Sequence, residues 1–217
     1  MIVITGASDG LGFALAKLYA ERGEKVANIS RRECEYAEKN YLCDLADSEQ
    51  IGNAAKELQN NQEPIAALIN CAGVLSVQDL DSIDATELQH VFAVNVEAPI
   101  LLTSKLIEKL KANGSDIVNI ASTVGTKAYA SQAAYGASKW ALRGFSQNLQ
   151  LELKSLPNRV ISFCPGGFRT KLFEKATGID NTIQGDWMSP TDLAAFIITI
   201  LDLPKNIEVS EVIVNRK

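Results

Sequence analysis

A glycine-rich turn near the start of the chain constrains the fold more than any other stretch of the sequence. It reads GASDGLG and lies between an apolar strand, Ile2 to Thr5, and a helix-periodic run, FALAKLYAERG. The glycines Gly6, Gly10 and Gly12 let backbone approach a pyrophosphate, which free N–H groups at the helix amino terminus can bind. A second strand from Lys25 to Ser30 completes a pattern that predicts a dinucleotide-binding α/β fold.

The end of the second strand indicates which dinucleotide fits. An NAD-binding unit carries Asp or Glu about 20 residues past the glycines, where the carboxylate binds the ribose 2′-hydroxyl. Here the sequence has Ser30, Arg31 and Arg32, and the first acid is Glu33. A guanidinium suits a 2′-phosphate, so NADP(H) is favoured over NAD(H). Two solvated surface arginines would give the same pattern.

The rest of the chain alternates buried strands with amphipathic helices, as a parallel sheet covered on both faces requires. Strands are expected at residues 41–43, 64–70, 116–121, 159–164 and 208–215, and helices at 46–59, 87–112, around 135 to 156, and 190–203. The 31–40 connection is too short for more than a stub of helix. Pro99 is expected to kink the long helix near Asn95, although a simple bend would explain that residue equally well.

Tyr135 and Lys139 lie four residues apart in AAYGASK, so a helix stacks them on one face. A free phenol has a pKa of about 10, and an ammonium one turn away is expected to lower it. Ser122 follows an apolar strand, at the edge where open α/β sheets bind ligands. A tyrosine and a lysine at this spacing also occur on ordinary helices, so the pair gains weight only from the other motifs.

Composition narrows the setting of the protein. The 217 residues carry a net charge of −5 without a basic stripe, so no nucleic-acid partner is expected. The four cysteines are scattered, which is typical of reduced core thiols in a reducing compartment. No signal peptide and no apolar run long enough to span a membrane is recognised. We expect one domain over residues 1–217, a cytoplasmic location and no metal site.

The order of the motifs resembles the short-chain dehydrogenase/reductase family. The matching residues are TGASDGLG from Thr5, Asp44, NCAG from Asn70, Asn95, Ser122, YGASK from Tyr135 and PGGFRT from Pro165. The resemblance implies a doubly wound Rossmann fold of about seven parallel strands in three α/β/α layers. It implies hydride transfer between a nicotinamide and a carbonyl or secondary alcohol, with Tyr135 as general acid/base. It also implies a catalytic group of Asn95, Ser122, Tyr135 and Lys139.

Further roles follow from the same resemblance. Ser122 would stabilise the oxyanion, Lys139 would bind the nicotinamide ribose, and Asn95 would hold a water that links Lys139 to solvent. Thr170 and the Pro165–Gly167 turn would orient the carboxamide. Cofactor contacts are expected from Gly6, Ser8, Asp9, Gly10, Leu11, Gly12, Arg31, Arg32, Asp44, Leu45, Asn70, Ala72, Gly73, Tyr135, Lys139, Pro165, Gly166, Gly167 and Thr170.

The sequence departs from the family pattern in two respects. NCAG stands where NNAG is usual, a change that keeps Asn70, Ala72 and Gly73. In addition, the helix between the second and third strands is nearly absent and the chain end follows soon after the last strand. Family members commonly use that end in subunit contacts, so a homo-oligomer, a dimer or tetramer, is expected but its form stays open. A non-catalytic NADP(H)-binding regulator remains the alternative, while an epimerase or dehydratase is disfavoured because no separate substrate domain is present.

The substrate is not specified by any motif. The expected pocket wall, 123–129 and 171–187, is apolar and aromatic with Lys127, Arg169 and Lys171 as the only anion anchors, which favours a medium-sized, fairly apolar ketone or aldehyde. Residues 171–189 combine turn formers with large apolar side chains, and we expect them to close over the ligands as a mobile lid.

Overall fold

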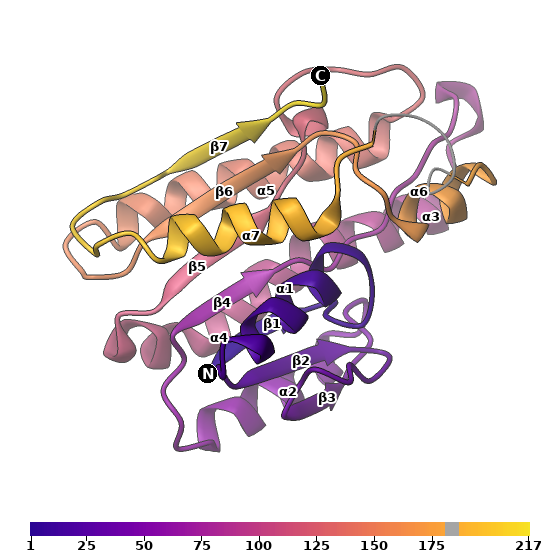
Figure 1. Ribbon diagram of the computed structural model, residues 1–217. Coiled ribbons are helices and arrows are strands. Elements are labelled where there is room, and N and C mark those ends of the chain that lie inside the picture. Colours follow the sequence, from indigo (N-terminus) through magenta and orange to yellow (C-terminus); the bar gives the residue numbers. More distant parts are fainter. Residues whose placement is uncertain (181–186) are drawn as a thin grey trace.

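The computed structural model describes residues 1–180 and 187–217, and these contain a parallel sheet in the order β3-β2-β1-β4-β5-β6-β7 (Figure 1). The strands are β1 (Ile2–Thr5), β2 (Val26–Ser30), β3 (Lys39–Leu42), β4 (Ala67–Asn70), β5 (Asp116–Ile120), β6 (Val160–Pro165) and β7 (Glu211–Val214). The chain builds outward from β1 to β3 and then resumes on the other side with β4. The predicted doubly wound sheet is confirmed, with its switch point between β1 and β4.

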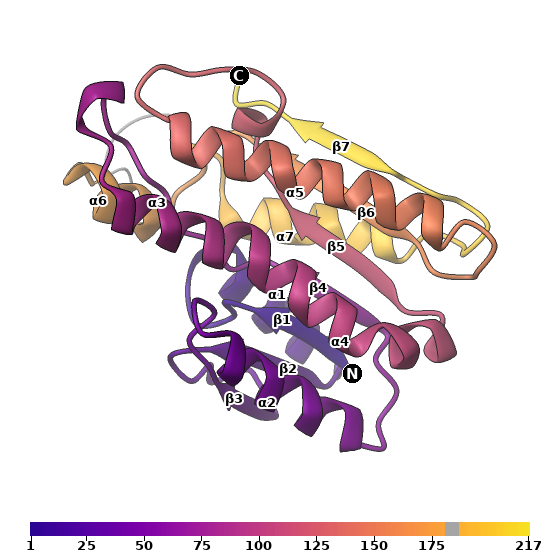
Figure 2. The same ribbon diagram turned by 180° about the vertical axis from the view of Figure 1, so that it is seen from behind.

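Helices cover both faces of the sheet (Figures 1 and 2). One face carries α1 (Gly10–Glu21) and α7 (Pro190–Leu201), and the other α2 (Ser48–Asn60), α4 (Ala98–Asn113) and α5 (Ala133–Glu152). Each face encloses its own buried apolar cluster, which explains why the central strands are apolar throughout. The short helices α3 (Ala85–Phe92) and α6 (Lys171–Thr177) lie where the strands end.

The connection between β2 and β3 contains no helix, so the expected stub does not form. Buried amide side chains organise it instead. Asn28 Nδ2 donates to the Arg32 carbonyl (2.9 Å) and to Asn40 Oδ1 (2.8 Å). Asn40 Oδ1 also accepts from the Cys34 N–H (2.9 Å). These bonds give the backbone the partners that a helix would have supplied, and they fix the loop that begins with the two arginines.

The long helix is continuous through Asn95, but its hydrogen-bond pattern changes there, near the predicted kink. A π-helical segment, η2 (Ala93–Glu97), separates α3 from α4 and contains Asn95. Pro99 lies in the first turn of α4, directly after this segment. Both the π-helical hydrogen bonds and the missing N–H of Pro99 therefore alter the helical ladder near Asn95.

The continuous helical run Ala85–Asn113 is long and apolar enough to count as a candidate membrane span among the described residues, contrary to the sequence expectation. A core helix of a water-exposed protein passes the same test. Here Leu102, Leu106 and Leu110 are fully buried in the core on one face of the sheet.

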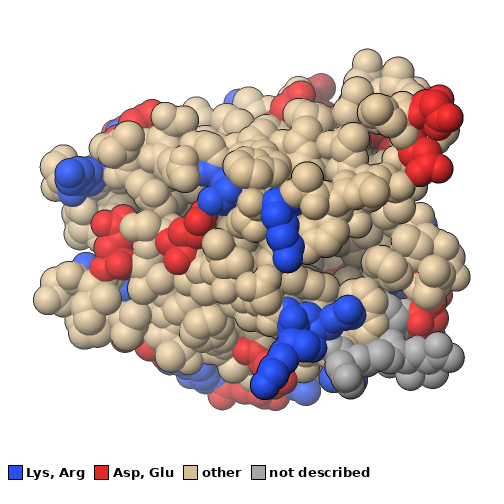
Figure 3. Space-filling model, turned by 90° about the horizontal axis from the view of Figure 1, so that it is seen from above, with Lys and Arg blue, Asp and Glu red and all other residues tan. Residues whose placement is uncertain are grey.

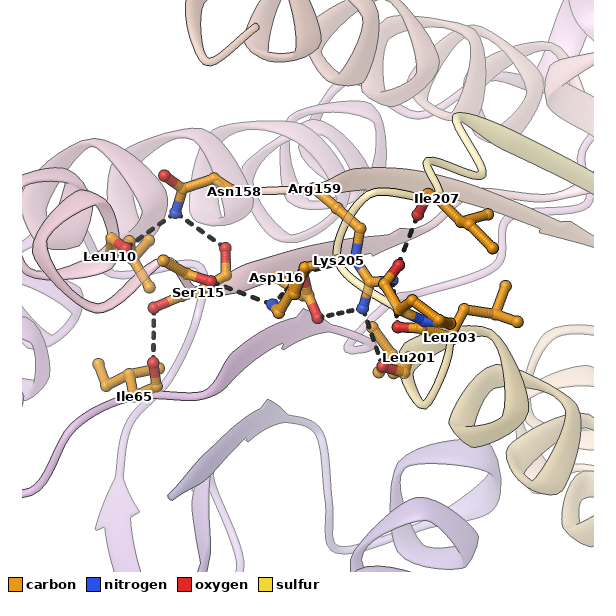
Figure 4. Close-up of polar contacts among 12 residues, drawn as sticks. Ile65, Leu110, Ser115, Asp116, Asn158, Arg159, Leu201, Leu203, Lys205 and Ile207 are labelled. Atoms are coloured by element: carbon orange, nitrogen blue, oxygen red, sulfur yellow. Dashed lines mark hydrogen bonds and ion pairs between the residues drawn. The ribbon is translucent and has the colours of Figure 1, made fainter. Parts of the chain in front are cut away.

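A charged network joins elements at the amino-terminal end of the sheet (Figure 4). Arg159 donates to both carboxylate oxygens of Asp116 (3.0 and 2.8 Å) and to the carbonyls of Leu201 (2.8 Å) and Leu203 (2.9 Å). Lys205 adds a second bond to Asp116 (2.7 Å). Because α7 ends at Leu201, the last carbonyl groups of this helix have no N–H partners within it, and Arg159 donates to one of them. The network ties α7 to the starts of β5 and β6.

Candidate active site

A cavity of about 530 Å³ opens at the carboxyl ends of the strands, where the switch point places it. The sequence-predicted residues that line it are Gly6, Ser8, Asp9, Gly10, Leu11, Gly12, Arg31, Arg32, Asp44, Leu45, Ala72, Gly73, Ser122, Tyr135, Lys139, Pro165, Gly166, Gly167 and Thr170. Asn70 and Asn95 do not line it, because both are buried behind the wall. One cavity thus brings together residues spread over most of the chain.

The glycine turn packs tightly on itself. A Cβ at Gly12 would lie 2.4 Å from the Gly6 carbonyl oxygen, so only glycine lets the first turn of α1 close on the end of β1. A Cβ at Gly10 would lie 3.1 Å from Thr170 Oγ1, across the cavity. Asp9 caps α1 by accepting from the Gly10 N–H (2.8 Å). Gly12 therefore packs the fold, while Gly10 keeps the cavity narrow near Thr170.

The arginines at the end of β2 differ in their partners. The Arg32 carbonyl accepts from Ser30 Oγ (2.6 Å), and the Arg32 guanidinium pairs with Asp9 Oδ2 (3.2 Å). Lys175 of α6 approaches the same carboxylate oxygen (3.7 Å). Arg31 is exposed and forms no ion pair with the residues that the structure describes. Arg31 is the arginine whose charge is not already balanced.

Tyr135 and Ser122 face each other from the start of α5 and the end of β5. Burial raises the pKa of Tyr135 to about 12, and a hydrogen bond from the Ser122 side chain lowers it. Ser122 Oγ also accepts from the Val124 N–H (3.2 Å) and lies 3.4 Å from the Pro165 carbonyl oxygen. Tyr135 is therefore a neutral phenol near pH 7, with a hydroxyl beside it.

Lys139 lies one helical turn from Tyr135, with its Nζ 5.7 Å from the centre of the phenol ring. Burial lowers the pKa of Lys139 to about 8, and the Nζ donates to the Ile120 carbonyl (2.8 Å). The expected lowering of the Tyr135 pKa by this ammonium is wrong for the ligand-free protein. Desolvation dominates the pKa values of both groups.

Asn95 joins three segments through its side chain. Its Oδ1 accepts from the Val74 N–H (2.8 Å), and its Nδ2 donates to the Val74 carbonyl (2.9 Å) and to Ser138 Oγ (3.0 Å). Both amide protons are used, so only one acceptor position of Oδ1 is left for a water. A Cβ at Gly73 would lie 3.3 Å from that oxygen and 3.5 Å from Lys139 Nζ. Asn95 and Lys139 thus share Gly73 as a neighbour.

Asn70 occupies the layer below the cavity. Its Nδ2 donates to Asn119 Oδ1 (2.8 Å) and contacts Thr103 Oγ1 (3.4 Å). Asn119 in turn donates to Ser146 Oγ (2.9 Å), which links β4 and β5 to α5. The position of Asn70 indicates that it supports the cavity floor, and that its neighbours Ala72 and Gly73 form the surface.

The expected substrate wall is formed in part. Lys127, Tyr129, Leu172, Phe173 and Trp187 line the cavity. Arg169 and Lys171 do not, and Ile179 is exposed outside it. Ile183 and the rest of residues 181–186, the middle of the expected lid, lie outside the described residues.

Sequence reasoning missed several residues at this end of the cavity, among them His90, Gln132 and Arg216. No motif marks them: His90 lies in α3, Gln132 directly precedes α5 and Arg216 follows β7. The strand order would have pointed to Arg216, since β7 lies beside β6 and ends at the same edge. Trp187 packs against Phe173 (5.2 Å between ring centres), and a Cβ at Gly167 would lie 2.4 Å from its ring.

The switch-point cavity and the glycine turn define a Rossmann-type dinucleotide-binding protein. A model of the short chain dehydrogenase family matches residues 1–179. The chain belongs to the short-chain dehydrogenase/reductase family of oxidoreductases.

Three of the proteins that it resembles match over most of their length. Carbonyl reductase family member 4 of Xenopus laevis is 32% identical, over 93% of this chain and 90% of that protein. A solved 4-hydroxyisoleucine dehydrogenase with NADH has a TM-score of 0.87 at 27% identity, covering 99% of this chain and 97% of that one. A short-chain dehydrogenase from Sphingobium yanoikuyae with NADPH has a TM-score of 0.83 at 26% identity, covering 93% and 83%.

Proposed function

We propose that the protein is an NADP(H)-dependent oxidoreductase that interconverts a carbonyl compound and its secondary alcohol. The observation that carries the proposal is the placement of Ser122, Tyr135 and Lys139 on the wall of one cavity. A phenol, a hydroxyl and a buried amine at the carboxyl ends of β5 and β6 can hold a proton at a carbonyl oxygen. The names of relatives, which include a carbonyl reductase, support the same reaction class.

The cavity fits a nicotinamide dinucleotide. It extends from Arg31, after β2, past the glycine turn to Lys139, so a two-part nucleotide can lie along the strand ends. One relative was solved with NADH and another with NADPH, which supports a nicotinamide cofactor of either kind. Arg31 favours NADP(H), since no ion pair with a described residue balances its charge where a 2′-phosphate would lie. When bound, the nicotinamide supplies or accepts the hydride.

Tyr135 is assigned the proton transfer. Because burial raises its pKa to about 12, the phenol keeps its proton at neutral pH and can donate it to a carbonyl oxygen during reduction. Reduction would place a hydride, supplied by a bound nicotinamide, on the carbonyl carbon and the Tyr135 proton on the oxygen, and it would leave Tyr135 as a phenolate. Ser122, within hydrogen-bonding reach of the phenol, is assigned to stabilise the developing oxyanion.

Lys139 is assigned to stabilise that phenolate as an ammonium. One of its three N–H donors goes to the Ile120 carbonyl, which leaves two for the ribose hydroxyls of the cofactor. Its pKa of about 8 lets it exchange protons near neutral pH, so it can help to reprotonate Tyr135. Asn95 is a positioning residue that clamps Val74 and Ser138, and its free acceptor position can take a donating water.

The remaining assignments concern the frame of the site. We assign Thr170 and the turn of Pro165, Gly166 and Gly167 to orient the carboxamide, and the other predicted lining residues to bind the cofactor. Asp44 is assigned with its neighbour Leu45 to the nucleotide base, since both line the cavity beside β3. We further propose that residues 1–217 act as one domain.

The experiment is a screen of carbonyl compounds with NADPH and NADH, in which turnover is measured as the loss of nicotinamide absorbance. We expect turnover with at least one ketone or aldehyde and tighter binding of NADPH. NADPH binding without consumption across aldehydes, ketones and keto acids would favour a non-catalytic regulator instead. No described feature favours that alternative, since Ser122, Tyr135, Lys139 and the positioning residue Asn95 are all present.

A further inference from the structure

The cavity is much more basic than the protein as a whole. Of the described residues that line it, six are lysine or arginine and only two, Asp9 and Asp44, are acidic. The chain as a whole has a net charge of −5. A cavity lined mainly by positive charge attracts anions, even in a protein whose net charge is negative. The next question is which anionic group, on the cofactor or on the substrate, each cation can bind.

The strand order divides these cations between two ends. Arg31 and Arg32 follow β2, whereas Arg216 follows β7, with β1, β4, β5 and β6 between them. At a spacing of about 4.8 Å per strand, the two ends lie roughly 24 Å apart along the edge of the sheet. The proposed cofactor phosphates account for the cations at the β2 end. A cation at the β7 end lies away from these phosphates, at the end of the cavity where the proposed substrate would bind.

Arg216 is held by stacking. The centre of its guanidinium lies 4.7 Å from the centre of the Trp187 ring. Trp187 is itself fixed between Phe173 and the backbone of Gly167. A guanidinium stacked on an aromatic face keeps its N–H donors at its edge, where they can bind a planar anion. The backbone of Arg216 lies near Gly166, next to the Pro165 carbonyl that Ser122 contacts.

A second arginine, Arg143, also stacks on a tryptophan, but its contacts indicate a structural role. Arg143 lies 5.2 Å from the Trp140 ring, but its guanidinium also binds both oxygens of Glu211 (2.8 and 2.9 Å) and the Gly125 carbonyl (2.6 Å). Arg216 forms no ion pair with any residue in the described part of the chain. Lys127 likewise rests on the Tyr129 ring (5.5 Å) without a carboxylate partner there. Figure 3 shows lysine and arginine side chains near the middle of the face on the β7 side.

We infer that the substrate is an anionic carbonyl compound whose carboxylate or phosphate is bound by Arg216, with Lys127 adding to the positive field. The inference rests on the proposed function, since it places the carbonyl at Tyr135 and Ser122. It replaces the expected apolar ketone with an amphipathic one. The apolar part packs on Leu172 and Phe173, which line the cavity, and Phe173 contacts the Trp187 ring on which Arg216 stacks.

The test compares matched substrate pairs with NADPH as the reductant. Each pair is a keto carboxylate and its methyl ester, or a keto phosphate and the corresponding keto alcohol. We expect the wild type to favour one anionic member by about ten- to hundredfold in kcat/KM, as charge-assisted hydrogen bonds allow. Arg216→Met keeps an apolar side chain against Trp187 and should lose this preference through a higher KM, with the neutral partner unaffected. The preference should also shrink in high salt.

Arg169→Met is the matched control, because Arg169 is also an exposed arginine near the turn after β6 but does not line the cavity. It should keep the preference, and both variants should bind NADPH as the wild type does.

Equal kcat/KM for charged and neutral partners in the wild type would overturn the inference and leave the proposed reaction standing. If no pair turns over but the wider carbonyl screen finds a substrate, the inference is overturned; if that screen finds none either, the proposed reaction fails. Titration of the keto acids into the NADPH complex, with Trp187 fluorescence in a Trp140→Phe background, then tests the anion site alone. No saturable, Arg216-dependent change would overturn the anion site as well.

Discussion

Each end of the sheet carries a buried cation, and the two cations differ in how many hydrogen-bond and charge partners surround them. At the amino-terminal end, Arg159 is 3% exposed and has Asp116 and several carbonyls around its guanidinium. At the carboxyl-terminal end, Lys139 is 4% exposed and has one backbone carbonyl. A hydrogen bond to Asp116 raises the pKa of Arg159, whereas burial lowers the pKa of Lys139 to about 8.

This difference separates a structural charge from a functional one. A buried charge with all its donors satisfied stabilises one arrangement of the elements around it. A buried charge with spare donors and a perturbed pKa costs stability, and such groups cluster where ligands bind. The fold therefore keeps its compensated network at one end, away from the cavity, and leaves the other end ready to pair with something that the chain does not contain.

The largest expected effect is at the carboxyl-terminal end. Tyr135→Phe removes the proposed proton donor without changing the packed ring, so kcat should fall by about 10²- to 10⁴-fold. The free energy of unfolding and the NADPH dissociation constant should stay close to the wild-type values. Steady-state kinetics, urea unfolding and fluorescence titration measure the three quantities. A variant that keeps more than a few per cent of wild-type kcat would show that another group supplies the proton.

At the opposite end, Asp116→Asn should act on stability alone. Removal of the carboxylate leaves the Arg159 charge buried without its counter-charge, which typically costs about 3–5 kcal/mol. Urea unfolding should show this loss, while kcat and KM measured below the unfolding transition stay unchanged. Equal stability of variant and wild type would mean that the Arg159 carbonyl contacts suffice. A changed kcat would show that the two ends are coupled.

The sequence predicted the cavity better than it predicted the network that holds the sheet together. The motifs around Gly6, Ser122 and Tyr135 are local, because each is a short run at the end of one strand or the start of one helix. The Arg159 network joins residues far apart along the chain, with Asp116 at the start of β5 and Leu201 at the end of α7. No spacing rule connects such positions until the strand order is known. Arg216 was missed for the same reason.

Local sequence patterns also did not predict how far the titratable groups are removed from water. The turn of helix between Tyr135 and Lys139 was predicted, but their pKa values depend on burial that only the assembled fold produces. The π-helical segment at Asn95 had no sequence signal beyond an unfavourable residue in a helix interior. The doubly wound parallel sheet followed from the resemblance and the structure confirmed it, but the strand order came from the structure.

The cofactor end allows a sharper comparison between two neighbouring arginines. Arg31→Ala should remove most of the preference for NADPH over NADH, roughly ten- to hundredfold in the dissociation constant. Arg32→Ala is the matched control and should have a smaller effect, because Asp9 already balances the Arg32 charge. Fluorescence titrations of both cofactors give the constants. Equal wild-type affinities for NADPH and NADH, or a larger loss in Arg32→Ala, would contradict this assignment.

Replacing the uncompensated cation should stabilise the fold, in contrast to Asp116→Asn. The pKa of Lys139 in the folded protein, about 8, lies below that of a free lysine, so the unfolded state binds more protons between about pH 8 and 10. The charged form therefore destabilises the fold below pH 8, and this cost disappears as pH rises through that range. Lys139→Met should be more stable than wild type by about 1–3 kcal/mol at pH 7, less so at pH 9.5, and nearly inactive. A pH-independent difference between the two proteins would contradict the shifted pKa.

The smallest effect should come from the second cation on Asp116. The Lys205 side chain is 51% exposed, so its bond to Asp116 competes with water and salt. Lys205→Met leaves the two bonds between Arg159 and Asp116 in place, and urea unfolding should show a loss below about 1 kcal/mol. Added salt should reduce the difference further, because an exposed pair is screened. A loss as large as that of Asp116→Asn would mean that Lys205, not Arg159, neutralises the carboxylate, and the distinction between exposed and buried cations at this end would fail.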